Sequence, residues 1–239
     1  MQLLERTLDT PAENVALDEA LLLSAEAGDA TDEVLRIWEP RQYFVVLGSS
    51  SRIASEVNVE YCKSQGIDVV RRTSGGAAIV AGPGCLMYSL ILSLAERPEL
   101  RSIDRAHRFV LDALAAAFGR LVLGVARRGT SDLAIGDRKF SGNSLRLKRR
   151  HLVYHGTLLY DFSLDLIGVC LPTPPRQPAY RASRSHDDFI VNLPLDRRSI
   201  HAAVTSAFGD STHRQNWPSE LTAKLTAEKF TDDDWTNRI

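Results

Sequence analysis

The sequence predicts an α+β fold, in which a mostly antiparallel or mixed β-sheet is flanked by helices. Strand-like segments outnumber helical ones, they follow one another in hairpins, and helices are interspersed between them. No break in composition, internal repeat or low-complexity segment divides the 239 residues. We therefore expect a single domain over residues 1–239, which is long enough to bury a sizeable core.

The composition excludes several classes of protein. A formal net charge of −1 gives no reason to expect binding to nucleic acid or to an anionic membrane. The N-terminus lacks the features of a signal peptide, and the apolar stretches stop short of the roughly 18–20 residues of a bilayer span. Three cysteines without a CxxC pair indicate reduced thiols and favour neither a disulfide framework nor a zinc site. These observations predict a cytoplasmic protein.

The first half of the chain begins with a capped helix. Thr10 can cap the backbone N–H of Glu13, Pro11 suits the first turn, and Gly28 is expected near the end of the helix. A second, short helix is expected around residues 58–65. Runs of β-branched and aromatic residues predict strands at 33–40, 43–49, 67–72, 77–82 and 86–94, the last two paired as a hairpin through Gly82-Pro83-Gly84.

The second half alternates in the same way. Apolar periodicity predicts a helix over residues 102–119, and two weaker helical patterns follow near the end of the chain. Four prolines make residues 171–181 an ordered loop or lid. The predicted strands are 121–127, 132–135, 138–147 and 152–161, and the late helices are 199–209 and 219–230.

A predicted strand that ends in two arginines leads into two hydroxyl residues and two glycines, Arg71-Arg72-Thr73-Ser74-Gly75-Gly76, here named the RRTSGG segment. Glycines let a backbone approach an anion closely, and arginine binds carboxylate or phosphate in a bidentate way. The segment therefore suits a bound carboxylate, an adenylate phosphate or both. A strand end with two solvated arginines and a tight turn fits these residues equally well.

Residues 130–144, TSDLAIGDRKFSGNS, combine carboxylates with a strand rich in hydrogen-bond donors. Asp132 and Asp137 each offer the hard oxygen ligand that magnesium prefers. In an extended strand Lys139, Ser141 and Asn143 share one face, where a lysine can stabilise charge developing on a carboxylate and an α-phosphate. On these residues alone, a charged hairpin turn with a solvated lysine is the more common arrangement.

A third segment that could take part in the chemistry is the apolar run LVYHGTLLY, in which His155 precedes Gly156. A glycine inside a strand marks a close backbone approach, here to a ligand. A core or edge histidine with satisfied hydrogen bonds is the alternative, and by itself the more common one. The basic residues 148–151 are expected at a solvated hairpin tip, or in contact with a nucleotide phosphate or an acidic protein.

In this order the three segments resemble the lipoate–protein ligase A family, whose fold is shared with the catalytic domain of biotin–protein ligases. Residues 71–79 match its pattern RRxSGGxAV, residues 131–144 match NDLxxxDRKxSGSA, and residues 154–159 match HHGTLL. The resemblance spans most of residues 1–195. Weaker similarity covers residues 14–21, 35–38, 45–48 and 184–193.

The resemblance implies a two-step ligation, in which ATP and lipoate or octanoate form an acyl-adenylate and the acyl group then moves to a lysine of a lipoyl carrier domain. Lys139 would be the catalytic residue that contacts the carboxylate and the acyl-phosphate, and Asp132 would hold Mg²⁺. The implied carriers are of the 2-oxoacid dehydrogenase E2 or glycine cleavage H protein type. Residues implied to line the acyl and nucleotide site are Arg72, Ser74, Gly75, Gly76, Ala77, Ala78, Ser141 and Gly142, with His155, Gly156 and Thr157 along the acyl channel and Trp38, Val46 and Leu158 around the aliphatic chain.

Three positions depart from the family pattern. Ala77 stands where a third glycine is usual, and Ala81 and Cys85 stand where histidine and asparagine are frequent, so we expect a pocket of different shape. Ligases of this family carry a smaller C-terminal accessory domain, for which a chain ending at Ile239 has no room. We expect a separate accessory subunit to complete adenylation, or the chain to perform only the transfer step.

An acyltransferase of the same fold, which moves octanoyl or lipoyl groups between carriers, is the nearest alternative. Such an enzyme needs a cysteine with a partly exposed thiolate. Only Cys85 and Cys170 remain as candidates, and each is expected to be a buried free cysteine. A non-catalytic lipoyl-binding protein is a second alternative. Biotin ligation is disfavoured, because the glycine- and arginine-rich loop of that family is not found.

Overall fold

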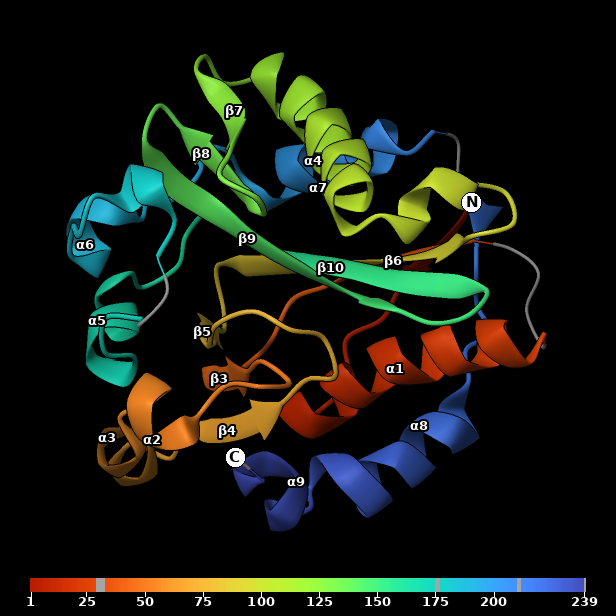
Figure 1. The fold of residues 1–239 in the computed structure, drawn as a ribbon, viewed down its shortest axis with the longest axis horizontal. Coiled ribbons are helices and arrows are strands. Elements are labelled where there is room, and N and C mark those ends of the chain that lie inside the picture. The colour runs from red at the N-terminus through yellow and green to blue at the C-terminus, as the bar shows by residue number, and fades with distance from the viewer. Residues whose placement is uncertain (29–32, 175–176, 210–211, 239) are drawn as a thin grey trace.

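A computed structural model describes residues 1–28, 33–174, 177–209 and 212–238. Its strands form an eight-stranded sheet in the order β11-β1-β2-β6-β10-β9-β8-β7 and a three-stranded sheet in the order β4-β3-β5 (Figure 1). The large sheet contains β1 (Gln2–Glu5), β2 (Val34–Trp38), β6 (Cys85–Ser93), β7 (Val125–Arg128), β8 (Asp132–Ile135), β9 (Arg138–Leu147), β10 (His151–Leu159) and β11 (Thr212–His213). The small sheet contains β3 (Phe44–Leu47), β4 (Asp68–Arg71) and β5 (Ile79–Ala81).

Both sheets are mixed, which confirms the predicted α+β class. β1 pairs in parallel with β2 and β11, and β3 pairs in parallel with β4. The remaining ladders, from β2 through β6, β10, β9 and β8 to β7, are antiparallel. Residues 130–144 and 152–160 therefore lie on neighbouring antiparallel strands of the large sheet, whereas the RRTSGG segment begins at the end of β4 in the small sheet.

Helices cover both faces of the large sheet. α4 (Ile103–Gly119) and α7 (Arg197–Ala207) pack on one face, and α1 (Pro11–Ala27) packs on the other (Figure 1). Because both faces are covered, every residue of β2 is buried. The other helices are α2 (Ile53–Glu56), α3 (Val59–Ser64), α5 (Asp165–Cys170), α6 (His186–Phe189), α8 (Ser219–Leu225) and α9 (Asp233–Asn237), with a π turn at Thr226–Phe230.

Helix α1 has the predicted capping box. The Thr10 hydroxyl accepts from the Glu13 N–H at 3.2 Å, and the Glu13 carboxylate accepts from the Thr10 N–H at 2.8 Å. The helix ends at Gly28, whose φ of 89° is a left-handed conformation that suits glycine. Residues on all sides of α1 are buried, so the helix lies inside the protein and not on its surface.

The predicted hairpin between residues 77–82 and 86–94 is wrong. β5 pairs with β3 in the small sheet, whereas β6 pairs with β2 and β10 in the large one. The Gly-Pro-Gly turn carries the chain from one sheet to the other, close beneath the end of β10. At Gly84, with φ of 80°, a Cβ would lie 2.2 Å from the backbone of Asp161.

The late helical patterns are confirmed in part. α7 overlaps the helix predicted at 199–209 but begins earlier, at Arg197, and the pattern at 219–230 is divided between α8 and the π turn. Pro175, in the predicted proline loop, lies outside the described residues. In the part of the chain that the structure describes, no helix combines the length and apolar character needed to cross a membrane.

Candidate active site

The three predicted segments meet at one cavity of about 410 Å³, a size typical of small-molecule sites. Its walls come from α1, the residues after β4, the β8–β9 hairpin and β10. Predicted site residues in its wall are Arg72, Gly76, Ala77, Ala78, Asp132, Lys139, Gly142, His155, Gly156 and Thr157. Ser74, Gly75 and Ser141 are not among the lining residues.

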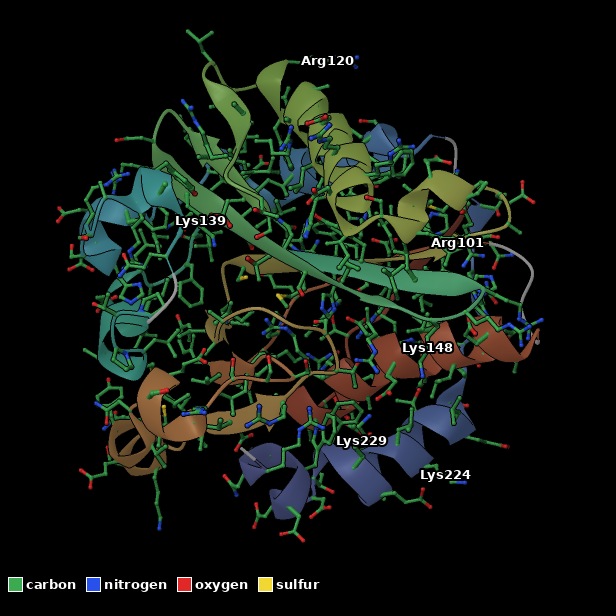
Figure 2. The ribbon with its side chains drawn as sticks, viewed as in Figure 1. Arg101, Arg120, Lys139, Lys148, Lys224 and Lys229 are labelled. Atoms are coloured by element: carbon green, nitrogen blue, oxygen red, sulfur yellow. The ribbon has the colours of Figure 1, made fainter. Side chains whose placement is uncertain are left out.

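Lys139 and Asp132 form an ion pair in the wall of the cavity. Lys139 lies at the start of β9 (Figure 2), and its Nζ is 2.7 Å from Asp132 Oδ1. The other oxygen, Oδ2, accepts from the Tyr180 hydroxyl at 2.8 Å. Burial, followed by the charge of Asp132, raises the pKa of Tyr180, so this hydroxyl stays protonated and donates. Asp132 is thus the acceptor for two donors from different parts of the chain.

A β-bulge sets which residues of β9 share a face. Asp132 pairs with Gly142, but the register then shifts, so that Ala134 pairs with Lys139. Lys139 therefore lies on the face of Asp132 and Gly142; a Cβ on Gly142 would be 2.9 Å from Lys139 Nζ. The prediction that Lys139 and Ser141 share a face is wrong, because the extra residue in the bulge reverses the alternation between them.

Arg72 organises the RRTSGG segment from within. Its buried guanidinium donates to the carbonyls of Val46, Gly75 and Ala77 at 3.1, 2.6 and 3.0 Å. Its Nε donates to Ser74 Oγ at 3.0 Å. These bonds fold the segment around the cation, so Arg72 shapes the loop as well as lining the cavity.

The charge of Arg72 is retained at neutral pH. Burial lowers its pKa to about 10, and the Glu56 carboxylate acts in the opposite direction. No carboxylate of the described residues bonds directly to Arg72, so this buried cation gives the adjacent cavity a positive potential, which favours an anionic ligand.

His155 connects the RRTSGG segment to helix α1. Its Nε2 is 2.6 Å from Ser74 Oγ, and its Nδ1 is 3.1 Å from Asp18 Oδ2. Ionised Asp18 can only accept, so His155 Nδ1 carries a proton and donates it to Asp18. With the imidazole in this tautomer, Nε2 accepts from the Ser74 hydroxyl.

Asp18 is a site residue that sequence reasoning did not single out. It also accepts from Arg36 at 2.7 Å and from the Ser89 hydroxyl at 2.6 Å. Burial raises the pKa of Asp18, but Arg36 and His155 outweigh burial and hold it below its ordinary value. The available signal was a pair of acidic residues, Asp18 and Glu19, between two apolar stretches of the predicted first helix.

Apolar side chains line another part of the cavity. Trp38 and Val46 lie there as expected, together with Val15, Ile79 and Met87. Leu158 does not, which corrects the expectation for it, since it packs in the main core beneath α4. An anion-favouring wall and an apolar wall in one cavity suit an amphipathic acid.

The cysteines lie away from this chemistry. Cys62, Cys85 and Cys170 are all buried free thiols, and none lines the cavity. Burial raises the pKa of Cys85 to about 12 and that of Cys170 to about 12. At neutral pH both are therefore unreactive thiols.

Asp132 provides one hard oxygen ligand for a divalent cation. In the described residues, no group of three or more His, Cys, Asp or Glu side chains gathers into a metal site. Magnesium is commonly held by one or two carboxylates together with phosphate and water, so a single aspartate beside an anion-binding cavity fits it. Asp137 does not line the cavity, and it pairs with Arg184 at 3.0 Å.

The fold and the lysine-bearing cavity define a protein with the architecture of lipoate–protein ligases. A crystal structure of lipoate-protein ligase A bound with ATP superposes with a TM-score of 0.83, 20% identity and coverage of 99% of this chain and 98% of that one. Residues 10–205 match the lipoyl protein ligase A/B catalytic domain. The chain belongs to this family.

Related sequences fall into two groups by name. Lipoate–protein ligase 1 of Staphylococcus aureus is 24% identical over 233 residues, which cover 95% of this chain and 65% of that protein. Octanoyltransferase LipM of Kyrpidia tusciae is 24% identical over 273 residues, covering 99% and 98%. A protein of Aeropyrum pernix, provisionally named a lipoate-protein ligase A, is 33% identical over 158 residues, 66% of this chain and 56% of that one. The chain thus spans less than two thirds of the length of the first and third of these relatives.

Proposed function

We propose that this chain is an ATP-dependent lipoate–protein ligase whose catalytic domain covers residues 1–239. It activates lipoate or octanoate to the acyl-adenylate and transfers the acyl group to a lysine of a lipoyl carrier domain. The observation that carries this proposal is the Lys139–Asp132 pair in a cavity that also presents the buried Arg72 cation and an apolar wall.

In the first step a carboxylate oxygen of the acid attacks the α-phosphorus of ATP, and pyrophosphate leaves. Negative charge is concentrated where the carboxylate meets the α-phosphate, and the Lys139 ammonium stabilises it there. In the second step the carrier amine attacks the acyl carbon, AMP leaves, and the amine loses a proton. No nucleophile from this chain is needed, because the carrier supplies the amine.

Mg²⁺ bound at Asp132 would neutralise phosphate charge during the first step. If Asp132 held this ion, Lys139 would no longer be neutralised by Asp132 and would be available to bind the substrate carboxylate. The RRTSGG segment, with Arg72, Ser74, Gly75 and Gly76, and the following Ala77 and Ala78 hold the acyl and nucleotide groups. Gly142 leaves room for the Lys139 ammonium, Ser141 accepts from the Asn143 amide on the opposite face of β9, and His155, Gly156 and Thr157 form the acyl channel.

Relatives support both the substrates and the partners. Apart from the ATP-bound ligase, a structure with bound lipoic acid from Thermoplasma acidophilum shares the fold, with a TM-score of 0.80 and 19% identity. Lipoate-protein ligase A subunit 1 of the same organism is 22% identical over 95% of this chain and 94% of its own length. A bi-partite ligase with its E2 lipoyl domain is also similar in fold. We therefore include in the proposal a separate accessory subunit and carriers of the E2 or H protein type.

One specific observation favours a second function, cysteine-dependent octanoyl transfer. Relatives named octanoyltransferase LipM match nearly the whole chain. The burial of Cys85 and Cys170 and their raised pKa values argue against it, because the transfer needs an accessible thiolate.

The test is lipoate-dependent exchange of labelled pyrophosphate into ATP, with and without candidate accessory subunits. We expect exchange in the wild-type protein and a loss on the order of 10²–10³ in Lys139→Met. Lys148→Met, at the exposed β9–β10 tip, is the matched control and should keep full activity. An acyl-enzyme thioester lost in Cys85→Ala or Cys170→Ala would overturn the ligase in favour of transfer. Lipoate binding without turnover under every condition would instead support a non-catalytic lipoyl-binding protein.

A further inference from the structure

The last helical segment, residues 219–238, lies beyond the residues that match the family and packs beneath the site. We name it the C-terminal segment; it contains α8, the π turn and α9. Figure 1 shows it against α1 and β4, on the side of α1 away from the large sheet. None of its residues lines the cavity.

Its first anchor is an ion pair with α1. Lys229 Nζ lies 2.6 and 2.9 Å from the two carboxylate oxygens of Glu19, and both side chains are largely buried. Glu19 is the chain neighbour of Asp18, the carboxylate that accepts from His155. The ion pair therefore anchors α1 at Glu19, the residue next to Asp18 of the site.

Its second anchor is the fully buried Arg71. The Arg71 Nε and Nη2 donate to the Thr236 carbonyl at 2.9 and 2.7 Å, while Nη1 donates to the carbonyls of Gly48 and Ser51 at 2.7 and 2.8 Å. In return, the Trp235 indole N–H donates to the Arg71 carbonyl at 2.8 Å. Arg71 is the chain neighbour of Arg72.

A third contact reaches the loop after β3. Arg238 donates to the Ser49 carbonyl, and Ser49 N–H donates to the Ser74 carbonyl at 2.8 Å. The two loops are in direct contact, since a Cβ on Gly48 would lie 1.9 Å from the Gly76 carbonyl oxygen. A shift of the loop after β3 is therefore transmitted to the RRTSGG segment.

We propose that the C-terminal segment is a positioning element of the active site, with Lys229 and Trp235 as its positioning residues. The segment holds α1 and the RRTSGG segment in the arrangement that binds the acyl substrate. Within the described residues, the buried Arg71 cation has no directly bonded carboxylate, so its site depends on the carbonyls that surround it. Loss of the Thr236 carbonyl would leave two of its donors unpaired and free the segment to move.

The experiment compares Lys229→Met with Lys224→Met. Both lysines lie in the C-terminal segment (Figure 2), but Lys224 is exposed and has no bonded partner among the described residues. Amide hydrogen exchange is measured over residues 47–51 and 71–78, well below the melting temperature of each variant. We expect faster exchange there in Lys229→Met and unchanged exchange in Lys224→Met. Trp235→Phe, which keeps one aromatic ring but removes the N–H donor and part of the indole, should repeat the Lys229→Met result if that variant does not fold.

The kinetic readout rests on the proposed function. KM for lipoate should rise on the order of tenfold in Lys229→Met with a smaller change in kcat, because the bound substrate is misplaced while Lys139 is intact. Folded Lys229→Met and Trp235→Phe proteins with unchanged exchange at residues 71–78 would overturn the proposal. If the wild-type protein shows no ligation, the proposed function fails, while the exchange comparison still decides the positioning role.

Discussion

The Lys139 ammonium and the Asp132 carboxylate are 2.7 Å apart, with both side chains in the cavity wall. In this arrangement the charge that would stabilise a reacting carboxylate is already neutralised by a neighbour. An anionic substrate must therefore compete with Asp132 for Lys139, or a bound cation must replace Lys139 as the partner of the Asp132 carboxylate. The ion pair makes the two residues functionally dependent on each other.

Asp132→Asn should raise the Mg²⁺ concentration needed for half-maximal pyrophosphate exchange on the order of tenfold or more, because a neutral amide is a weaker ligand than a carboxylate. Asp137→Asn is the matched control on the same hairpin, since Asp137 is exposed and paired with Arg184. Titration of Mg²⁺ at saturating lipoate gives the comparison. An equal response of the two variants would contradict the assignment of Asp132.

Cys85 and Cys170 should resist alkylation by iodoacetamide in the native protein at pH 7.5 and react after unfolding in urea. Burial and pKa values of about 12 keep both as thiols. The Cys85→Ala and Cys170→Ala variants that fold should keep ligation activity within about twofold. Rapid labelling of either thiol in the native state, measured by mass spectrometry, would count against this expectation.

Asp18→Asn should destabilise the protein by about 3–5 kcal/mol at pH 7, because it leaves the buried Arg36 without its charged partner. Since the pKa of Asp18 is lower in the folded protein than in the unfolded chain, its charge stabilises the fold above about pH 4. That contribution is lost as the pH falls through the folded-state pKa. The difference between wild type and variant in urea unfolding should therefore narrow below about pH 4. Asp9→Asn, which breaks an exposed pair, should change stability by less than about 1 kcal/mol.

Gly156→Ala should destabilise the protein by about 1–3 kcal/mol through overpacking. A Cβ at this position would lie 1.8 Å from Asn143 Oδ1 and 2.9 Å from the Tyr88 ring. Gly119→Ala provides a control of opposite sign: it lies in helix α4 with open space around it, so alanine should stabilise by up to about 1 kcal/mol. Urea unfolding of both variants measures the two effects, and equal destabilisation would contradict the packing argument.

Much of the fold follows from local rules. The start of α1 could be predicted because Thr10 and Glu13 satisfy each other's backbone within one turn. Most strands could be predicted from side-chain type, because covered sheets select β-branched and aromatic residues. Gly156 does mark a close approach, but the groups that approach it are the Asn143 side chain from the neighbouring strand and the Tyr88 ring. The approach of a ligand to Gly156 stays a prediction.

The errors arose where pairing depends on distant segments. β5 and β6 lie in different sheets because β5 pairs with β3, whereas β6 pairs with β2 and β10. The bulge that places Lys139 beside Asp132 has no strong local signal, because no glycine or proline stands at the shift. Asp18 was overlooked for a related reason, as its partners are separated from it by between 18 and 137 positions.

Helix α1 carries Asp18 and Glu19 side by side, one bonded toward the cavity and the other toward Lys229. Consecutive residues project about 100° apart around an α-helix. Two anchors at that angle fix the rotational phase of the helix about its own axis. Insertion of a single residue in α1 ahead of Asp18 would turn both carboxylates away from their partners together, so the length of this helix is as constrained as its composition.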